Sequence, residues 1–206
     1  FRPRCRIRGG CCSSLLRQIL RKNCNIQAEK VNVPDLPFRV LVSYKNIPHL
    51  YGRIIRIDDA TRNRLGNKSW DPKFWEKIGH FPALKSFDQF LPETNDYQLH
   101  RVEIKVDALP AGQYALFTSS DPSFSDSSAL NLQYFFCSSI AFVNHGPDYF
   151  VVDRSSGNPL ASVQVKSFYS VYDYRKQKDI FRKAGSYTTD LHGHFRLNPD
   201  KMNSYQ

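Results

Sequence analysis

Residues 102–117, Val-Glu-Ile-Lys-Val-Asp-Ala-Leu-Pro-Ala-Gly-Gln-Tyr-Ala-Leu-Phe, contain the clearest indication of the fold class. Residues 102–106 alternate apolar and charged side chains, and this period of two is typical of a strand with one buried face. Residues 109–112 contain Pro and Gly and predict a turn, after which residues 113–117 begin a return strand. The sequence therefore predicts an antiparallel strand pair here.

Further strands are expected on both sides of this pair. Extended apolar or alternating patterns occur at residues 38–44, 50–57, 132–143, 149–152, 163–168 and 187–195, with polar turns between them. The aromatic share is 14%, mostly Phe and Tyr, which also favours pleated surfaces. We therefore expect a mainly β protein with two Ig/fibronectin-like β-sandwich domains, preceded by a short α-helix.

Two short helices interrupt the β pattern. Residues 13–23 have an apolar face opposite a basic and polar face, as an amphipathic helix has. The candidates for its N-cap and its end are Ser13, Ser14, Asn23 and Asn25. Residues 71–78 predict a second helix, with Asp71 as N-cap and Pro72 in the first turn. We expect this second helix to be an insertion across one sandwich edge.

The length of 206 residues allows one or two small domains. The Asn-His-Gly-Pro break at residues 144–147 predicts the junction between them. We expect a basic segment with the end of a helical region at 1–30, a first sandwich at 31–144 and a second sandwich at 145–206. About 60 residues remain for the second sandwich, against roughly 100 for a full seven-stranded one. It is therefore compact or truncated, and we expect it to be the less stable half.

The formal net charge of +10 is concentrated at one end of the chain. Residues 1–24 carry seven Arg and Lys and no Asp or Glu, which leaves +3 for the remaining 182 residues. A basic segment can bind phosphate or an anionic membrane surface. Because the body is nearly balanced, a solvated basic end is the favoured interpretation, and no nucleic-acid partner is expected.

The five cysteines form no recognisable disulfide or metal pattern. Four are near the start, Cys5, Cys11, Cys12 and Cys24, without a Cys-x-x-Cys pair. Cys137 stands alone after an apolar run, and we interpret it as a small buried hydrophobic residue and not as a nucleophile. The sequence has neither a membrane-length apolar run nor a signal peptide, and we interpret it as an excerpt of a larger protein.

The sequence motifs of serine hydrolases, zinc proteases and phosphate-binding loops are absent. The six histidines are His49, His80, His100, His145, His192 and His194. His192, His194 and Asp190 are the best metal candidates, but exposed turn positions are the favoured interpretation. We expect a structural hydrogen bond at His100. The loop carboxylates Glu93, Asp96, Asp121 and Asp126 are expected to cap turns and not to form a glycosidase pair. We assign no catalytic, cofactor-binding or metal-binding residue.

Aromatic residues gather around the second helix. Trp70 and Trp75, with Phe74 and Phe81 nearby, could form a platform for a sugar or a base. The core interpretation is favoured, because this helix needs an apolar face with which to dock.

Several motifs together resemble the bacterial α2-macroglobulin family, in particular members of the Bacteroides type. Residues 153–165, which begin Asp-Arg-Ser-Ser-Gly-Asn-Pro-Leu-Ala, are similar to the family pattern DrxTGkPlagaxV, and residues 189–195, Thr-Asp-Leu-His-Gly-His-Phe, to TDxxGxF. The earlier segments that resemble the N-terminal portion of such proteins are residues 31–34, 42–47, 50–54, 96–100 and 109–114. The resemblance covers roughly residues 13–206.

The resemblance implies macroglobulin-type sandwiches within a protease trap. In that family, cleavage of a bait segment collapses the molecule around the protease, and in many members a reactive thioester then captures it. A helical-repeat region precedes the first macroglobulin domains, which would account for the helix at 13–23. This sequence contains no Cys-Gly-Glu-Gln thioester and no recognisable bait region, so neither element is carried over.

We therefore expect a non-catalytic scaffold, not an enzyme, within a large secreted endopeptidase inhibitor of a bacterial periplasm, envelope or cell surface. The expected partners are neighbouring domains of the parent chain and, through the intact parent only, target proteases. Membrane contact is expected only through a lipid anchor outside this sequence. The alternative function is a cell-surface adhesion or glycan-binding module that uses Trp70 and Trp75. An enzyme is the third possibility.

Overall fold

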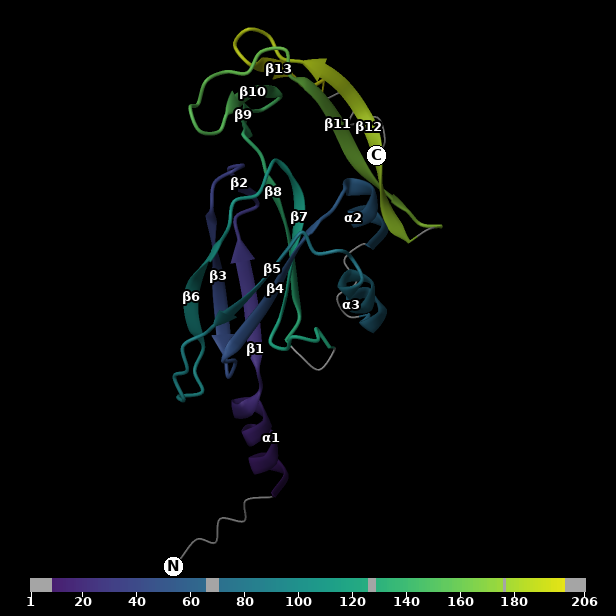
Figure 1. Ribbon diagram of the computed structural model, residues 1–206. Coiled ribbons are helices and arrows are strands. Elements are labelled where there is room, and N and C mark those ends of the chain that lie inside the picture. Colours follow the sequence, from purple (N-terminus) through teal and green to yellow (C-terminus); the bar gives the residue numbers. More distant parts are fainter. Residues whose placement is uncertain (1–8, 66–70, 126–128, 176, 199–206) are drawn as a thin grey trace, which may run out of the picture. The chain divides into compact units, whose positions relative to one another are not determined.

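A computed structural model describes residues 9–65, 71–125, 129–175 and 177–198, and the chain divides into two compact units, Phe1–Cys137 (unit 1) and Ser138–Gln206 (unit 2) (Figure 1). The elements of unit 1 are α1 (Gly9–Leu20), β1 (Asn23–Ala28), β2 (Val31–Asn32), β3 (Phe38–Lys45), β4 (His49–Arg56), α2 (Asp59–Leu65), α3 (Pro72–Gly79), β5 (Lys85–Phe90), β6 (His100–Val106), β7 (Gly112–Ser119) and β8 (Asn131–Cys137). Those of unit 2 are β9 (Ile140–His145), β10 (Asp148–Asp153), β11 (Gln164–Asp173), β12 (Lys178–Thr188) and β13 (His194–Arg196). The expected mainly β fold is confirmed.

Unit 1 is a sandwich of a small sheet, in the order β1-β3-β6, and a large sheet, in the order β2-β8-β7-β4-β5. All strand pairs are antiparallel except β2 with β8. The alternation of apolar and polar residues sets the register of β3 against β6. Val40 lies opposite Ile104, and both side chains are buried. An inner core of apolar side chains from both sheets fills the sandwich, including Leu50, Tyr114 and Phe135.

The large sheet also carries a second apolar cluster on its outer face. Tyr114 and Leu116 of β7 belong to the inner core, whereas Ala115 and Phe117 belong to this outer cluster together with Phe74 of α3. Successive side chains of a strand point to opposite faces, so α2 and α3 must cover the second face (Figure 1). The expected position of the helical insertion across a sandwich edge is therefore corrected to a position over a sheet face.

The strands at 102–106 and 113–117 form, but they do not pair with each other. β6 pairs with β3 in the small sheet, and β7 pairs with β4 and β8 in the large sheet. β6 has one buried face, whereas all residues from Tyr114 to Ser119 are buried, so the two strands need different surroundings. The expected hairpin is thus an arch between the two sheets.

A tyrosine corner holds this arch. The Tyr114 hydroxyl donates a hydrogen bond of 2.8 Å to the carbonyl oxygen of Pro110, four residues upstream. The ring stacks on Phe135, with centroids 5.6 Å apart, and is fully buried. This arrangement is characteristic of immunoglobulin-like sandwiches, where it locks a connection between opposite sheets.

We expect Tyr114→Phe to lower the free energy of unfolding of unit 1 by about 1–2 kcal/mol, because the ring stays in place while one hydrogen bond is lost. Urea denaturation followed by circular dichroism measures this effect. Tyr97→Phe is the control, since the Tyr97 side chain is 49% exposed. Equal effects of the two substitutions would contradict a locking role for the corner.

Side-chain amides join the edges of the two sheets. Gln133 of β8 accepts a bond of 2.9 Å from the Ala28 backbone N–H and donates one of 2.8 Å to the Ala28 carbonyl. Asn131 donates a bond of 2.7 Å to the carbonyl of Cys24. β1 is therefore part of the sandwich, and unit 1 includes strand residues from the segment expected at 1–30.

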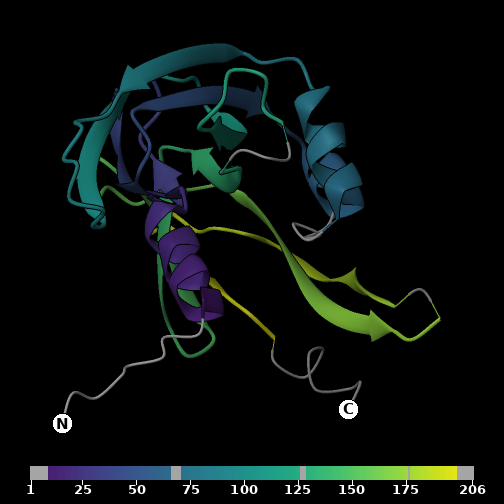
Figure 2. The same cartoon turned by 90° about the horizontal axis from the view of Figure 1, so that it is seen from below.

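Helix α1 confirms the expected helix but ends earlier, at Leu20, because β1 already begins at Asn23. Ser13 and Ser14 lie inside the helix and are not its N-caps. The Asn46 side-chain amide donates a bond of 2.8 Å to the carbonyl of Ile19, which satisfies one carbonyl in the last turn. Both views show α1 standing outside the sheets at the start of β1 (Figure 1, Figure 2).

Unit 2 consists of a three-stranded sheet, in the order β13-β10-β9, and a two-stranded sheet of β11 and β12. The strand expected at 132–143 breaks at Ser138, whose hydroxyl accepts a bond of 3.1 Å from the Ile140 N–H, and its halves β8 and β9 belong to different units. Of the Asn144–Pro147 segment, Asn144 and His145 end β9, and Gly146 and Pro147 form the turn to β10. The division of the chain falls before this turn, after Cys137.

Unit 2 has a small core. Among its described residues, only Val151 and Phe195 are buried apolar side chains. Exposed ones include Phe142 and Val143 of β9, and Phe168 and Phe181 of the long curved β11–β12 hairpin (Figure 2). Because apolar burial is the main stabilising term, unit 2 stays the expected less stable half.

Candidate functional site

The two neighbouring histidines and Asp190 lie in and beside the turn before β13. The Asp190 carboxylate accepts bonds of 2.8 Å from the backbone N–H groups of both His192 and His194. These bonds, foremost that from His194, lower the pKa of Asp190. The His194 ring bonds to Asp148, at 2.9 Å. Across the described residues, no group of three metal-ligating side chains forms, so the carboxylate acts as a turn cap here.

The loop carboxylates also lie at turns. Asp96 accepts bonds from the Gln98 N–H and the His100 ring, each 2.9 Å long, and these lower its pKa to about 2. His100 therefore makes the structural bond expected of it. Asp121 accepts bonds from the side chains of Ser123 and Ser125, which help to lower its pKa. Glu93 is exposed, and Asp126 lies outside the described residues.

Cys24 and Cys137 are free and buried, with 7% and 2% of their surfaces exposed. Burial raises the pKa of Cys24 to about 11 and, helped by the charge of Asp35, raises that of Cys137. The thiolate is the reactive form, so both groups are poor nucleophiles at neutral pH. The side chains of Cys5, Cys11 and Cys12 lie outside the described residues.

We expect Cys24 and Cys137 to resist alkylation by iodoacetamide at pH 8 in the native protein and to react rapidly in urea. A raised pKa favours the protonated form of each thiol at pH 8, and burial blocks access. Peptide-resolved mass spectrometry separates these sites from Cys5, Cys11 and Cys12. If Cys24 reacted with iodoacetamide as fast in the native protein as in urea, its assignment to the inner core would be refuted.

The aromatic residues of α3 pack inward. The Trp75 ring stacks on Phe117 of β7, with centroids 5.9 Å apart and an interplanar angle of 16°. Phe74 meets Trp75 edge-on and is only 5% exposed. Trp75 is thus engaged with the outer cluster, as the core interpretation expects. Trp70 lies outside the described residues.

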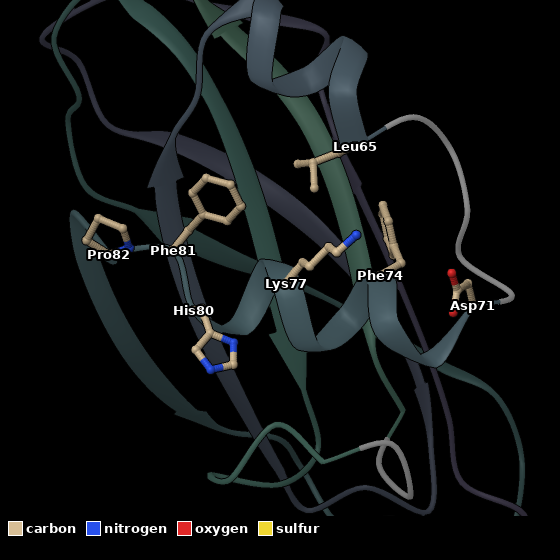
Figure 3. Close-up of a pocket in the computed structure, with 7 residues that line it drawn as sticks. All are labelled: Leu65, Asp71, Phe74, Lys77, His80, Phe81 and Pro82. Atoms are coloured by element: carbon tan, nitrogen blue, oxygen red, sulfur yellow. The ribbon is translucent and has the colours of Figure 1, made fainter. Parts of the chain in front are cut away.

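A hollow of about 520 Å³ lies beside α3. Its lining residues are Leu65 at the end of α2, Asp71, Phe74 and Lys77 of the α3 region, and His80, Phe81 and Pro82 after α3 (Figure 3). Small-molecule sites are typically apolar hollows of about 300–1,000 Å³ with a few placed polar groups. This hollow is our candidate functional site.

The polar groups of the hollow differ in what they are bonded to. The Asp71 carboxylate caps α3 by accepting a bond of 3.0 Å from the Lys73 N–H. The His80 ring N–H donates a bond of 2.7 Å to the carbonyl of Glu76 and thereby helps to end the helix. Lys77 forms no ion pair or hydrogen bond with the described residues.

Sequence reasoning identified part of this site. The helix, its Asp71 cap and its apolar face were predicted and are confirmed. Phe81 was expected near this helix, but the contributions of Leu65 and Pro82 were not predicted, because they depend on how α2 and the segment after α3 fold over the large sheet. The unpaired Lys77 carried no signal at all, since it lies in the last turn of a helix, where cations are common.

Every helix in the described residues is too short or too polar to span a bilayer. No protein-family model matches the chain, and none of the curated proteins matches it either. Among solved structures, the chain is similar to native α2-macroglobulin from Escherichia coli spanning domains MG0-NIE-MG1, with a TM-score of 0.54 and 14% identity. The fold is that of macroglobulin domains.

This likeness covers 85% of the present chain and 57% of the E. coli chain, so the present chain spans a little over half of that structure. A reconstruction of native E. coli α2-macroglobulin matches with a TM-score of 0.36 and 10% identity, over 86% of this chain and 14% of that one. The likeness to the MG0-NIE-MG1 structure confirms the macroglobulin-type fold that the motifs implied, whereas the Bacteroides type stays a prediction.

Proposed function

We propose that the chain is a non-catalytic scaffold of an α2-macroglobulin-like, protease-trapping protein. The observation that supports this function best is the likeness of its fold to native E. coli α2-macroglobulin domains over 85% of the chain. The proposal includes a place in the envelope, periplasm or outer surface of a bacterium. Its partners are neighbouring domains of the parent chain and, through the intact parent, target proteases.

The side chains that could take part in catalysis or metal binding have structural roles, which suits a scaffold. Asp96, Asp121 and Asp190 cap turns, and the thiols of Cys24 and Cys137 are buried in the inner core. The sequence holds neither a thioester motif nor a recognisable bait segment. In this proposal, rigid sandwiches position those elements, which the rest of the parent chain supplies.

The experiment that tests this function begins with sequencing of the gene in both directions and expression of the complete parent protein. We expect a secretory or lipoprotein signal upstream and further β-domains downstream. Trypsin mixed with the parent should lose activity on casein but keep its activity on a small chromogenic peptide, because a trapped protease still admits small substrates.

The 206-residue chain is the matched control in the same assay and should leave both trypsin activities unchanged. Inhibition of peptide cleavage by this chain alone would contradict the scaffold role. A parent protein that leaves casein cleavage intact, or a reading frame that ends close to residue 206, would refute the protease-trap part of the proposal.

A further inference from the structure

The hollow beside α3 combines apolar walls with the cationic side chain of Lys77. Leu65, Phe74, Phe81 and Pro82 supply apolar surface, and Phe74 is held in place because it is also part of the outer cluster. Figure 3 shows the Lys77 side chain extending from α3 toward the space between Phe74 and Leu65. The cavity lies entirely within unit 1.

The charges of the lining select among possible ligands. The Asp71 carboxylate accepts the bond that caps α3, and the His80 ring is bonded to the Glu76 carbonyl, whereas Lys77 has no hydrogen bond or ion pair with any described residue. A cationic ligand would be repelled by Lys77. A small inorganic anion would leave the apolar walls in contact with water, and a purely apolar molecule would make no use of the Lys77 charge.

We propose that this hollow binds an apolar carboxylate, with the hydrocarbon or aromatic group against Phe74 and Phe81 and the carboxylate paired with Lys77. Burial of the apolar group supplies the attraction, and the charged pair fixes its orientation. Two sources offer this chemistry, a free fatty acid and the apolar C-terminal residue of a peptide. The inference is independent of the protease-trap function, since it concerns one cavity of unit 1.

The test is a titration of the ¹⁵N-labelled 206-residue chain, followed by amide chemical shifts and by calorimetry. Decanoate represents the fatty acid, and N-acetyl-alanyl-phenylalanine with a free carboxylate represents the peptide terminus. Decanamide and the amidated dipeptide are their neutral counterparts. We expect saturable shifts at α3 and at Phe81, with each carboxylate that binds doing so about tenfold more tightly than its amide.

Matched variants isolate the charge. Lys77→Met keeps the length of the side chain and should weaken carboxylate binding about tenfold while leaving the amides unaffected. Lys77→Arg should largely restore binding. Lys73→Met is the control on the same helix, because Lys73 does not line the hollow, and it should bind as the unchanged protein does.

The outcomes also separate the two sources. Binding of decanoate alone assigns the site to fatty acids, and binding of the dipeptide alone assigns it to peptide termini. Shifts that do not saturate, shifts spread over both units, or undiminished carboxylate binding by Lys77→Met would each overturn the proposal. The unfolding midpoint of Lys77→Met should equal that of Lys73→Met, so a lost fold cannot imitate a lost site.

Discussion

Gly193→Ala is expected to unfold unit 2, because it should lower the free energy of unfolding of this unit by about 3 kcal/mol or more. Gly193 has a φ of +71°, a conformation that costs a residue with a Cβ atom about 1–2 kcal/mol. A Cβ atom there would also collide with the backbone carbonyl of Val151 and would lie 3.1 Å from the backbone nitrogen of Leu160. Backbone atoms cannot rotate away, so the strands themselves would have to separate.

The collision would act on the centre of unit 2. The Val151 N–H donates a bond of 2.8 Å to the Gly193 carbonyl, and β10 pairs with β13 through Tyr149 and Phe195. Because Val151 and Phe195 are the buried apolar side chains among the described residues of this unit, separating the strands exposes its core. Amide signals of unit 2, followed through a urea titration by NMR, measure the effect.

Gly157→Ala is the matched control for this substitution. Gly157 has nearly the same φ, +72°, but an added Cβ atom would meet nothing within 4 Å. We therefore expect it to lower the free energy of unfolding of unit 2 by only about 1 kcal/mol. If both substitutions have this small effect on the free energy of unfolding, the close approach of Gly193 to Val151 is not important for the stability of unit 2.

Phe135→Ala is expected to lower the free energy of unfolding of unit 1 by about 3–5 kcal/mol. The Phe135 ring is fully buried in the inner core, where it contacts Phe38 and Tyr114 at centroid distances of 5.3 and 5.6 Å. Truncation would leave a cavity between the two sheets at the tyrosine corner. Urea denaturation followed by unit 1 amide signals measures the loss.

The neighbouring residue is the control for this effect. Phe136 points to the opposite face of β8 and is 38% exposed, so Phe136→Ala should lower the free energy of unfolding by about 1 kcal/mol or less. The comparison also tests the independence of the two units, since Phe135→Ala should leave the unfolding midpoint of unit 2 unchanged. A shared shift of both midpoints would mean that the units unfold together.

Local features of this protein could be derived from its amino-acid sequence. The period of two at residues 102–106 requires one buried face, and the structure buries Ile104 and Val106 on it. Asp71 and Pro72 predict the start of α3, because a cap acts on backbone groups within one turn. The turn caps at Asp96 and Asp190 are local in the same way, since each carboxylate bonds to backbone N–H groups within four residues.

Tertiary structure alone decided which strands become neighbours. β6 and β7 are adjacent in sequence and were expected to pair with each other, but they lie in opposite sheets. The division of the chain after Cys137 and the hollow around Lys77 had no comparable local signal. Strand pairing and cavities depend on contacts between segments that are far apart in the sequence. The spacing of neighbouring residues does not determine the free energy of these contacts.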